Sequence, residues 1–248
     1  MIEVTNLTKA YGETLAVDDL TFTIRPGIVT GFLGPNGAGK STTMRMILGL
    51  DAPTSGTATV DGRPLAEHPL PLRSMGALLG DPQVVMLDEP VNGLDPEGIQ
   101  WIRNLLQDLA REGRTVFVSS HLMSEMELMA EHYVIIGRGR LIQDISADGL
   151  RAMADSNTTH VSADRLDDLV GLLRADGVTI DSADRGRVSV TGLDPEEIGV
   201  IARDHGIALT SLARDRRSLE DVFLVLTAGA VEYHGHGTAG SNQAAIAA

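Results

Sequence analysis

The nine residues Gly34–Thr42, with the sequence GPNGAGKST, decide how the first half of this chain folds. They follow a short apolar segment, residues 28–33, and precede a helix-compatible stretch, residues 40–50. The pattern G-x-x-x-x-G-K-[ST] between a strand and a helix predicts a phosphate-binding loop. Glycines let successive backbone N–H groups point at phosphate oxygens, and the helix N-terminus adds partial positive charge. An ordinary glycine-rich turn would not need the Lys-Ser-Thr ending.

The side chains that close this loop have expected partners in a bound nucleoside triphosphate. We expect Lys40 to reach the β- and γ-phosphates, Ser41 to ligate Mg²⁺ and Thr42 to donate toward the α-phosphate. The predicted nucleotide-binding residues of the loop are Gly34, Pro35, Asn36, Gly37, Ala38, Gly39, Lys40, Ser41 and Thr42.

A second polar cluster follows the apolar residues 84–87. Asp88 ends this predicted strand and is suited to hold the Mg²⁺ shell, while Glu89 is placed to polarise an attacking water. Farther on, the segment Asn92-Gly93-Leu94-Asp95 predicts a polar turn, and His121 follows the next predicted strand. Taken singly, an acid or a histidine at a strand end is more often structural. The order of these features after the glycine-rich loop favours one shared site.

The remaining pattern predicts an α/β fold with a second, smaller unit. Segments 20–24 and 57–60 alternate in polarity as antiparallel strands do, and later strand and helix signals alternate as in a mainly parallel sheet. The later segments are helix 97–111, strand 115–119, helix 122–131 and a hairpin of 133–136 with 140–143. We therefore predict a P-loop NTPase core over residues 1–150 with an antiparallel N-terminal β-subdomain.

Residues 155–228 predict a separate α+β domain. The order β-α-β-β-α-β, followed by a last helix that begins at the capping box Ser218–Asp221, is typical of a split βαβ or ferredoxin-like sandwich. Strands are expected at 159–161, 178–180, 187–191 and 207–212, and helices at 166–174, 198–205 and 218–226. The remaining residues 229–248 have little to bury and predict a disordered tail, in which His234 and His236 are solvated.

Composition excludes several classes of protein. The formal net charge of −14 argues against a nucleic-acid partner, because phosphate backbones are bound through a surplus of Lys and Arg. The chain has no cysteine, so neither disulfides nor thiolate chemistry are available. No run approaches 18 apolar residues, and no apolar segment marks the start as a signal peptide. We expect a cytoplasmic protein that meets a membrane only through a partner.

These motifs together resemble the ATP-binding subunits of ATP-binding-cassette (ABC) transporters of the ABC-2 or drug-exporter type. GPNGAGKST is similar to the family's Walker A, VVMLDE to its Walker B, and NGLD to its D-loop. The resemblance implies that Glu89 and His121 are catalytic, that Asp88 and Ser41 hold Mg²⁺, and that Tyr11 stacks on adenine while Asp95 contacts nucleotide. It also implies ATP and Mg²⁺ as cofactors, dimerisation, and docking on a membrane permease at the inner face of the cell membrane.

One stretch of the family pattern is missing. The resemblance calls for a Q-loop glutamine, a helical subdomain and an LSGGQ-like signature between Walker A and Walker B, yet only 48 positions separate Lys40 from Asp88. We expect an internal deletion whose joint lies at residues 77–79. Because neighbouring parallel strands need a crossover of about a dozen residues, Met75–Leu79 cannot be a strand beside 84–87 and is expected to be helical.

Two function classes remain open from the sequence. The first is the ATPase subunit of an exporter, which binds and hydrolyses ATP to drive transport through a separate permease. The second is an ATP-binding subunit that is deficient in hydrolysis and uncoupled, either regulatory or defective, because the signature and Q-loop are absent. A homodimer is expected to turn over poorly, whereas an intact paralogue in a heterodimer would supply the missing donors over Lys40 and Glu89.

Overall fold

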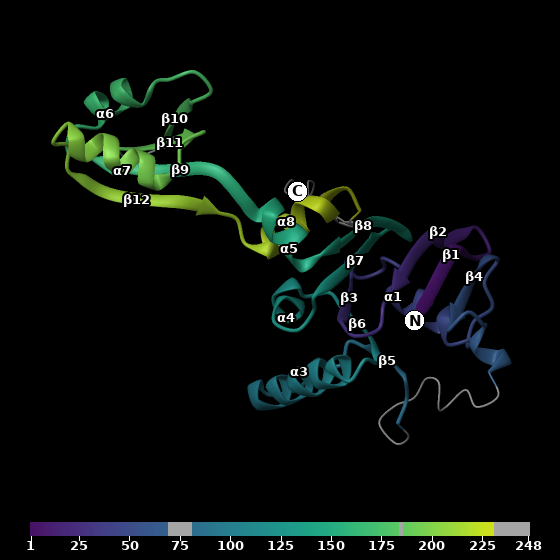
Figure 1. Cartoon of the computed structure of the whole chain (residues 1–248). Coiled ribbons are helices and arrows are strands. Elements are labelled where there is room, and N and C mark those ends of the chain that lie inside the picture. The colour runs from purple at the N-terminus through teal and green to yellow at the C-terminus, as the bar shows by residue number, and fades with distance from the viewer. Residues whose placement is uncertain (69–80, 184–185, 231–248) are drawn as a thin grey trace, which may run out of the picture.

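The structure, a computed structural model, describes residues 1–68, 81–183 and 186–230. Figure 1 shows a larger lobe that contains the N-terminal half of the chain and a smaller lobe formed by β9 to β12 with α6 and α7. The expected joint at residues 77–79, the helix expected around Met75–Leu79, and the tail from residue 231 onward with His234 and His236 lie outside the described residues.

The larger lobe is built on a five-stranded sheet in the order β5-β6-β3-β7-β8. Its strands are β5 (Val84–Asp88), β6 (Thr115–Ser120), β3 (Val29–Leu33), β7 (His132–Gly137) and β8 (Arg140–Ser146). The first four are parallel and β8 is antiparallel. This arrangement confirms the predicted mainly parallel core with an antiparallel addition.

Both faces of this sheet are covered, which explains why β3 is buried throughout. One face packs against α3 (Pro96–Arg111), α4 (Met123–Glu127) and other helices, with Tyr133 and Ile135 in the shared core. The opposite face packs against α1 (Lys40–Ile47) and the antiparallel subdomain. The strand that leads into the phosphate loop is thus fixed from both sides.

The antiparallel subdomain is a three-stranded sheet in the order β2-β1-β4. Its strands are β1 (Ile2–Tyr11), β2 (Thr14–Ile24) and β4 (Ser55–Val60), and a short 3₁₀ turn, η1 (Leu65–Glu67), follows. It is joined to the core sheet by three tilted aromatic rings, Phe22, Phe32 and Phe117, whose centroids are 5.0 to 6.0 Å apart. This predicted subdomain is therefore confirmed as a layer over the core.

Two helices differ from the prediction. The helix expected over residues 122–131 ends at Glu127, and the buried Met129 and Ala130 that prolong its apolar pattern lie in the turn after it. The helix α5 (Ala147–Ala154) was not predicted. Its signal is Ser146, whose side chain accepts a hydrogen bond from Gly149 N at 3.1 Å and so caps the helix.

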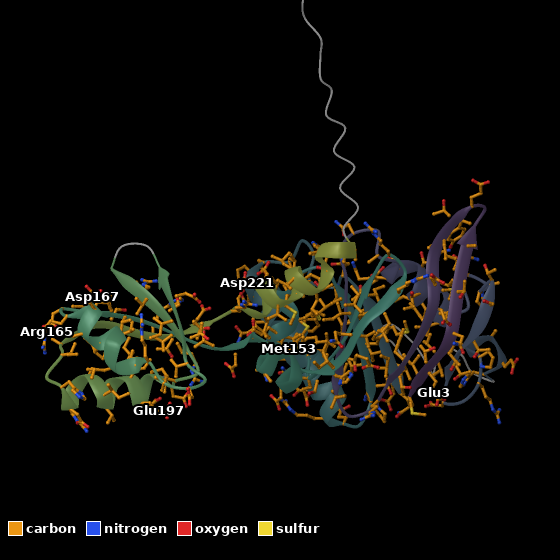
Figure 2. The ribbon with its side chains drawn as sticks, turned by 90° about the horizontal axis from the view of Figure 1, so that it is seen from above. Glu3, Met153, Arg165, Asp167, Glu197 and Asp221 are labelled. Atoms are coloured by element: carbon orange, nitrogen blue, oxygen red, sulfur yellow. The ribbon has the colours of Figure 1, made fainter. Side chains whose placement is uncertain are left out.

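The smaller lobe is a four-stranded antiparallel sheet with two helices. Its order, β10-β11-β9-β12, places β11 between β9 and β10, which is the split βαβ arrangement that the sequence predicted. The elements are β9 (Asp155–Ala163), α6 (Leu166–Leu173), β10 (Thr179–Ala183), β11 (Arg187–Thr191), α7 (Pro195–Asp204) and β12 (Leu209–Arg216). Figure 2 shows Arg165, Asp167 and Glu197 on this lobe, apart from the larger body.

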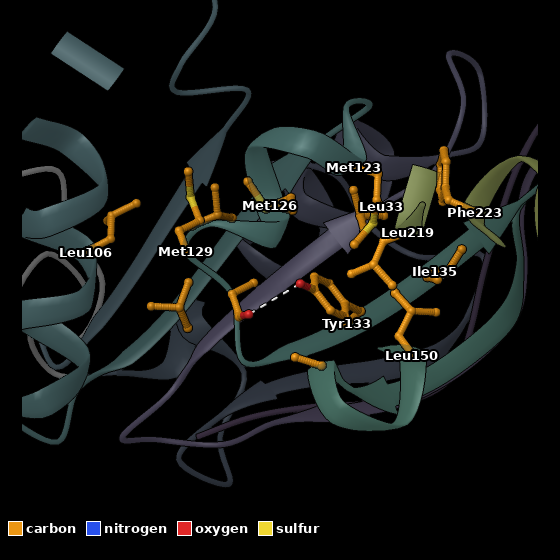
Figure 3. Close-up of a cluster of buried hydrophobic side chains, with 14 of the residues drawn as sticks. Leu33, Leu106, Met123, Met126, Met129, Tyr133, Ile135, Leu150, Leu219 and Phe223 are labelled. Carbon is orange, nitrogen blue, oxygen red and sulfur yellow. Dashed lines mark hydrogen bonds between the residues drawn. The ribbon is translucent and has the colours of Figure 1, made fainter. Parts of the chain in front are cut away.

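The last helix belongs to the larger lobe. The prediction placed it in the domain 155–228, but α8 (Leu219–Thr227) packs on α4 and α5, and η2 (Ala228–Ala230) follows it. Leu219 and Phe223 lie in the same buried cluster as Leu150 and Ile135 (Figure 3). The chain leaves the core for the accessory sheet and then returns to it. In the described ranges no helix is both long and apolar enough to cross a bilayer.

Candidate nucleotide site

The glycine-rich loop leaves the carboxyl end of β3 and leads directly into α1. Gly37 and Gly39 have φ angles of 79° and 99°, in the left-handed region that side chains disfavour. A Cβ atom on Gly34 would lie 2.6 Å from the carbonyl oxygen of Ile136, and one on Gly39 would lie 2.6 Å from that of Ala16. The loop geometry therefore requires glycine for both backbone shape and space.

Lys40 points back over the loop. Its side chain is 7% exposed, and its Nζ donates to the carbonyl oxygen of Gly34 at 2.7 Å and lies 3.7 Å from Glu89 Oε1. Burial lowers the pKa of the Lys40 ammonium, and the carboxylates of Glu89 and Asp88 oppose that shift. A cation held in this way above a glycine-rich loop is suited to receive phosphate oxygens.

Ser41, Asp88 and Ser119 form a chain of hydrogen bonds below the loop. Ser41 Oγ donates to Asp88 Oδ2 at 2.8 Å, and Ser119 Oγ donates to Asp88 Oδ1. The two oxygens of the Asp88 carboxylate are thus held by hydroxyl groups from two different elements, α1 and β6. Mg²⁺ prefers oxygen ligands and usually takes one or two protein groups together with waters and substrate phosphates. The adjacent hydroxyl and carboxylate of Ser41 and Asp88 fit that requirement.

Glu89 is held in an unusual backbone conformation. Its φ angle is 50°, which costs about 1–3 kcal/mol for a residue that is not glycine and is often found at functional sites. Its N–H donates to Ser119 Oγ at 3.0 Å. Its Oε2 lies 2.9 Å from His121 Nδ1 and accepts a hydrogen bond from Asn92 Nδ2 at 3.3 Å. Glu89 and His121, both predicted from the resemblance to be catalytic, are therefore in direct contact.

These groups border one open cavity of about 460 Å³. Its lining includes Lys40, Ser41, Thr42, Glu89 and His121. Other lining residues are Ala16, Asn36, Gly37, Ala38, Gly39 and Asn92. Asp88 lies behind Ser41, and Gly34 and Pro35 reach Lys40 through their carbonyl oxygens at 2.7 and 3.4 Å. The structure thus brings the predicted loop, acid and histidine residues together.

Besides Gly34, Pro35 and Asp88, two further predicted residues lie outside that lining. Tyr11, at the end of β1, is 49% exposed, its hydroxyl donates to Asp51 Oδ2 at 2.7 Å, and Lys9 Nζ is 4.9 Å from its ring centroid. Asp95 is the N-cap of α3, where its Oδ1 accepts a hydrogen bond from Gly98 N at 2.8 Å. The structure therefore shows a capping role for Asp95.

Three residues of this site were not among the predicted ones. Ser119 orients both Asp88 and the backbone of Glu89, Asn92 holds the Glu89 carboxylate, and Ala16 lines the cavity from β2. Ser119 and Asn92 stand beside residues that the sequence did indicate, and their hydrogen bonds depend on strand pairing. Nothing in the local sequence marks Ala16.

Comparison with protein families identifies two parts of the chain. Residues 17–76 match the family described as ABC transporter, and residues 157–220 match a domain of unknown function (DUF8746). The first match includes the glycine-rich loop, and the second coincides with the accessory sheet and its two helices.

Similar proteins include several ABC transporter ATP-binding proteins. An ABC transporter ATP-binding protein of Bacillus subtilis, YhcH, is 34% identical, with 64% of this chain and 74% of that protein covered. A bacitracin transport ATP-binding protein of Bacillus licheniformis is 28% identical, with 92% of this chain and 98% of that protein covered. A lantibiotic transport ATP-binding protein of Streptococcus pyogenes is 30% identical, with 60% and 92% covered.

Solved structures show the same fold. The ATP-binding subunit of an ABC transporter aligns with a TM-score of 0.56 at 21% identity and covers 62% of this chain and 92% of that one. The protein cbiO1 from Clostridium perfringens, described as part of an ABC transporter complex, aligns with a TM-score of 0.54 at 21% identity and covers 61% of this chain and 90% of that one. With the loop, the acids and the histidine assembled at one cavity, this chain belongs to the ABC transporter ATP-binding protein family and has that family's P-loop ATPase core.

Proposed function

We propose that this chain binds ATP with Mg²⁺ in the 460 Å³ cavity and energises export through a separate membrane permease. The observation that supports this most directly is the convergence of Lys40, Ser41, Glu89 and His121 on one opening at the carboxyl edge of the core sheet. Phosphate chemistry is favoured there because the loop provides backbone donors and Lys40 a positive charge.

Each side chain has a proposed role. Lys40 binds the β- and γ-phosphates, Ser41 and Asp88 hold Mg²⁺, and Glu89 orients the attacking water with His121 beside it. The bound Mg²⁺ would neutralise charge on the transferred phosphoryl group. Tyr11 would stack on adenine, although Asp51 and Lys9 hold it outside the cavity lining. We propose no nucleotide contact for Asp95, because its carboxylate already caps α3.

The partners follow from the relatives. Proteins named for bacitracin and lantibiotic transport are among them, so a compound of the bacitracin or lantibiotic kind is the proposed cargo. We propose that the chain acts in the cytoplasm as a dimer, docked on a permease at the inner face of the membrane.

The family pattern is shortened in this chain. The alignment with the bacitracin protein runs over 306 positions but includes 92% of this chain, about 228 residues, so about 78 positions lack a counterpart here. The match to the ABC transporter family ends at residue 76, directly before Ala77. Both observations support the proposal that the joint lies at residues 77–79.

Calorimetric titration of ATP into the wild type and into Lys40→Ala, each with and without Mg²⁺, tests the site. Loss of Lys40 removes two charge-assisted hydrogen bonds of roughly 1.5–3 kcal/mol each, so we expect affinity to fall at least about a hundredfold. Arg111→Ala is the control, since Arg111 is an exposed cation that pairs with Asp108 on α3. Unchanged ATP binding by a folded Lys40→Ala variant would refute the proposed site.

A further inference from the structure

A cluster of charged side chains surrounds Tyr11 where β1 ends beside α1 and the loop that follows it. Its centre is the carboxylate of Asp51. Asp51 Oδ2 accepts hydrogen bonds from the Tyr11 hydroxyl at 2.7 Å and from Arg45 Nε at 3.2 Å. Asp51 Oδ1 lies 3.3 Å from Lys9 Nζ. Asp51 therefore joins two residues of β1 to one of α1.

The ring of Tyr11 has one covered face and one open face. Lys9 Nζ lies 4.9 Å from the ring centroid, an arrangement in which a cation is attracted to the face of the ring. The Lys9 side chain is only 13% exposed, and its ammonium also donates to the carbonyl oxygen of Ala52 at 2.6 Å. Tyr11 itself is 49% exposed. The exposed part of the ring is therefore the side away from Lys9.

The hydroxyl end of Tyr11 is fixed as well. The hydrogen bond from Tyr11, followed by that from Arg45, lowers the pKa of the Asp51 carboxyl. Asp51 is thus an ionised and strong acceptor at neutral pH. A ring that is held at its hydroxyl and against one face has little rotamer freedom left. A molecule that stacks on this ring does not have to order it first.

Strand register places the ring beside the nucleotide cavity. Tyr11 pairs with Thr14 across the β1–β2 hairpin, and Ala16, two residues farther along β2, lines the cavity. Diagonal neighbours of this kind are roughly 7–8 Å apart, within reach of an aromatic side chain. The register shifts by one residue between Lys9 and Ala10, which makes Ala16 the extra residue of a bulge. Ala16 thus stands between the phosphate loop and Tyr11.

We propose that Lys9 and Asp51 are positioning residues that hold Tyr11 as a preformed platform for the adenine of ATP. The inference rests on the proposed function, which places the triphosphate on the glycine-rich loop and the base on Tyr11. Asp51 fixes the hydroxyl of the ring, and Lys9 supports the ring from behind, so adenine stacks on the open face. A cluster that only ties β1 to α1 would instead affect every ligand of the cavity equally.

Calorimetric titration of the full chain with ATP and with inorganic tripolyphosphate, both with Mg²⁺, separates these explanations. Tripolyphosphate offers phosphates without a base, so only ATP depends on the platform. Tyr11→Ala should lower ATP affinity roughly 5- to 150-fold, the range for loss of one base–aromatic stack. Asp51→Ala and Lys9→Met should each lower it about threefold to tenfold, because the ring must then be ordered on binding. Tripolyphosphate affinity should stay within about twofold in all three variants.

Two controls and a double variant isolate the role of Asp51. Arg45→Gln removes a partner of Asp51 whose side chain is 56% exposed, and it should change ATP affinity by less than about twofold. Asp51→Asn keeps an acceptor for the Tyr11 hydroxyl and should bind ATP more tightly than Asp51→Ala does. When Tyr11→Ala is already present, adding Asp51→Ala should cost no further ATP affinity, because Asp51 acts through the ring.

Several results would overturn the proposal. Parallel losses of ATP and tripolyphosphate affinity in Asp51→Ala would show that the cluster only supports the fold. Additive losses in the double variant would show that Asp51 does not act through Tyr11. Unchanged ATP affinity in Tyr11→Ala would mean that the base lies elsewhere, whereas failure of both ligands to bind the wild type would refute the nucleotide site itself. If Asp51→Ala does not fold, Tyr11→Phe removes the same hydrogen bond, and unchanged ATP affinity there would contradict positioning by Asp51.

Discussion

The two ends of β3 differ in how their polar groups are satisfied. Beyond the carboxyl end, Lys40 is bonded to the loop and Asp88 to two hydroxyls, so the nucleotide cavity is organised by the protein alone. Near the amino end, the buried hydroxyl of Thr30 finds no partner among the described residues. The nucleotide site is pre-organised, whereas the amino end of β3 keeps one buried polar group unsatisfied within the described residues.

Glu89→Gln tests the pre-organised end with the largest expected effect on turnover. If Glu89 is the general base, its loss should reduce steady-state ATP hydrolysis by about 10²–10⁴-fold while ATP affinity is retained. The basal rate of a homodimer is itself expected to be low, because one missing donor surface costs roughly 10²–10³-fold. Single-turnover assays with radiolabelled ATP provide the needed sensitivity.

The outcomes separate the two function classes. Hydrolysis by the wild type that disappears in Glu89→Gln supports the ATPase and contradicts a subunit without turnover. Equal rates in both proteins would mean that Glu89 is not the base, despite its contact with His121. No hydrolysis by a wild type that binds ATP normally would identify an ATP-binding subunit deficient in turnover.

Ser119→Ala tests whether the hydrogen bonds beneath the nucleotide cavity matter. Ser119 Oγ donates to Asp88 and accepts a hydrogen bond from the N–H of Glu89. Its loss should therefore lower the affinity for Mg²⁺ by about tenfold. The measurement is the Mg²⁺ concentration for half-maximal ATP binding, which a purely structural change would not shift selectively. Ser120→Ala is the control, since the hydroxyl of Ser120 bonds Leu122 and Glu125 instead. Equal shifts in both variants would argue against positioning by Ser119.

The difference between the two ends of β3 also explains what could be predicted. GPNGAGKST marks the loop after a strand and the start of a helix within nine residues, so local chemistry indicates the phosphate site. The surroundings of Thr30 depend on the pairing of β3 with β7, which lies about a hundred residues later in the chain, and of β7 with β8. Polar residues scattered along separate strands give no local signal.

Helix packing shows the same limit. The capping box at Ser218 correctly indicates where α8 begins, with Ser218 Oγ accepting from Asp221 N at 3.0 Å. A cap says nothing about the partner of a helix, so sequence order alone assigned α8 to the accessory domain. Its apolar residues Leu219 and Phe223 instead complete the larger core. The short α5 was overlooked because eight residues offer little periodicity.

Asp95→Ala has the smallest expected effect and tests a residue that family resemblance and geometry assign differently. As the N-cap of α3, Asp95 accepts from Gly98 N, and removing a cap costs about 0.5–2 kcal/mol of unfolding free energy. Urea denaturation should show this loss in Asp95→Ala and little in Asp95→Asn, because asparagine caps equally well. ATP affinity should remain within about threefold of wild type, since the Asp95 carboxylate lies outside the cavity lining and a cap contributes to stability. A large loss of affinity in both variants with stability unchanged would restore the nucleotide role for Asp95.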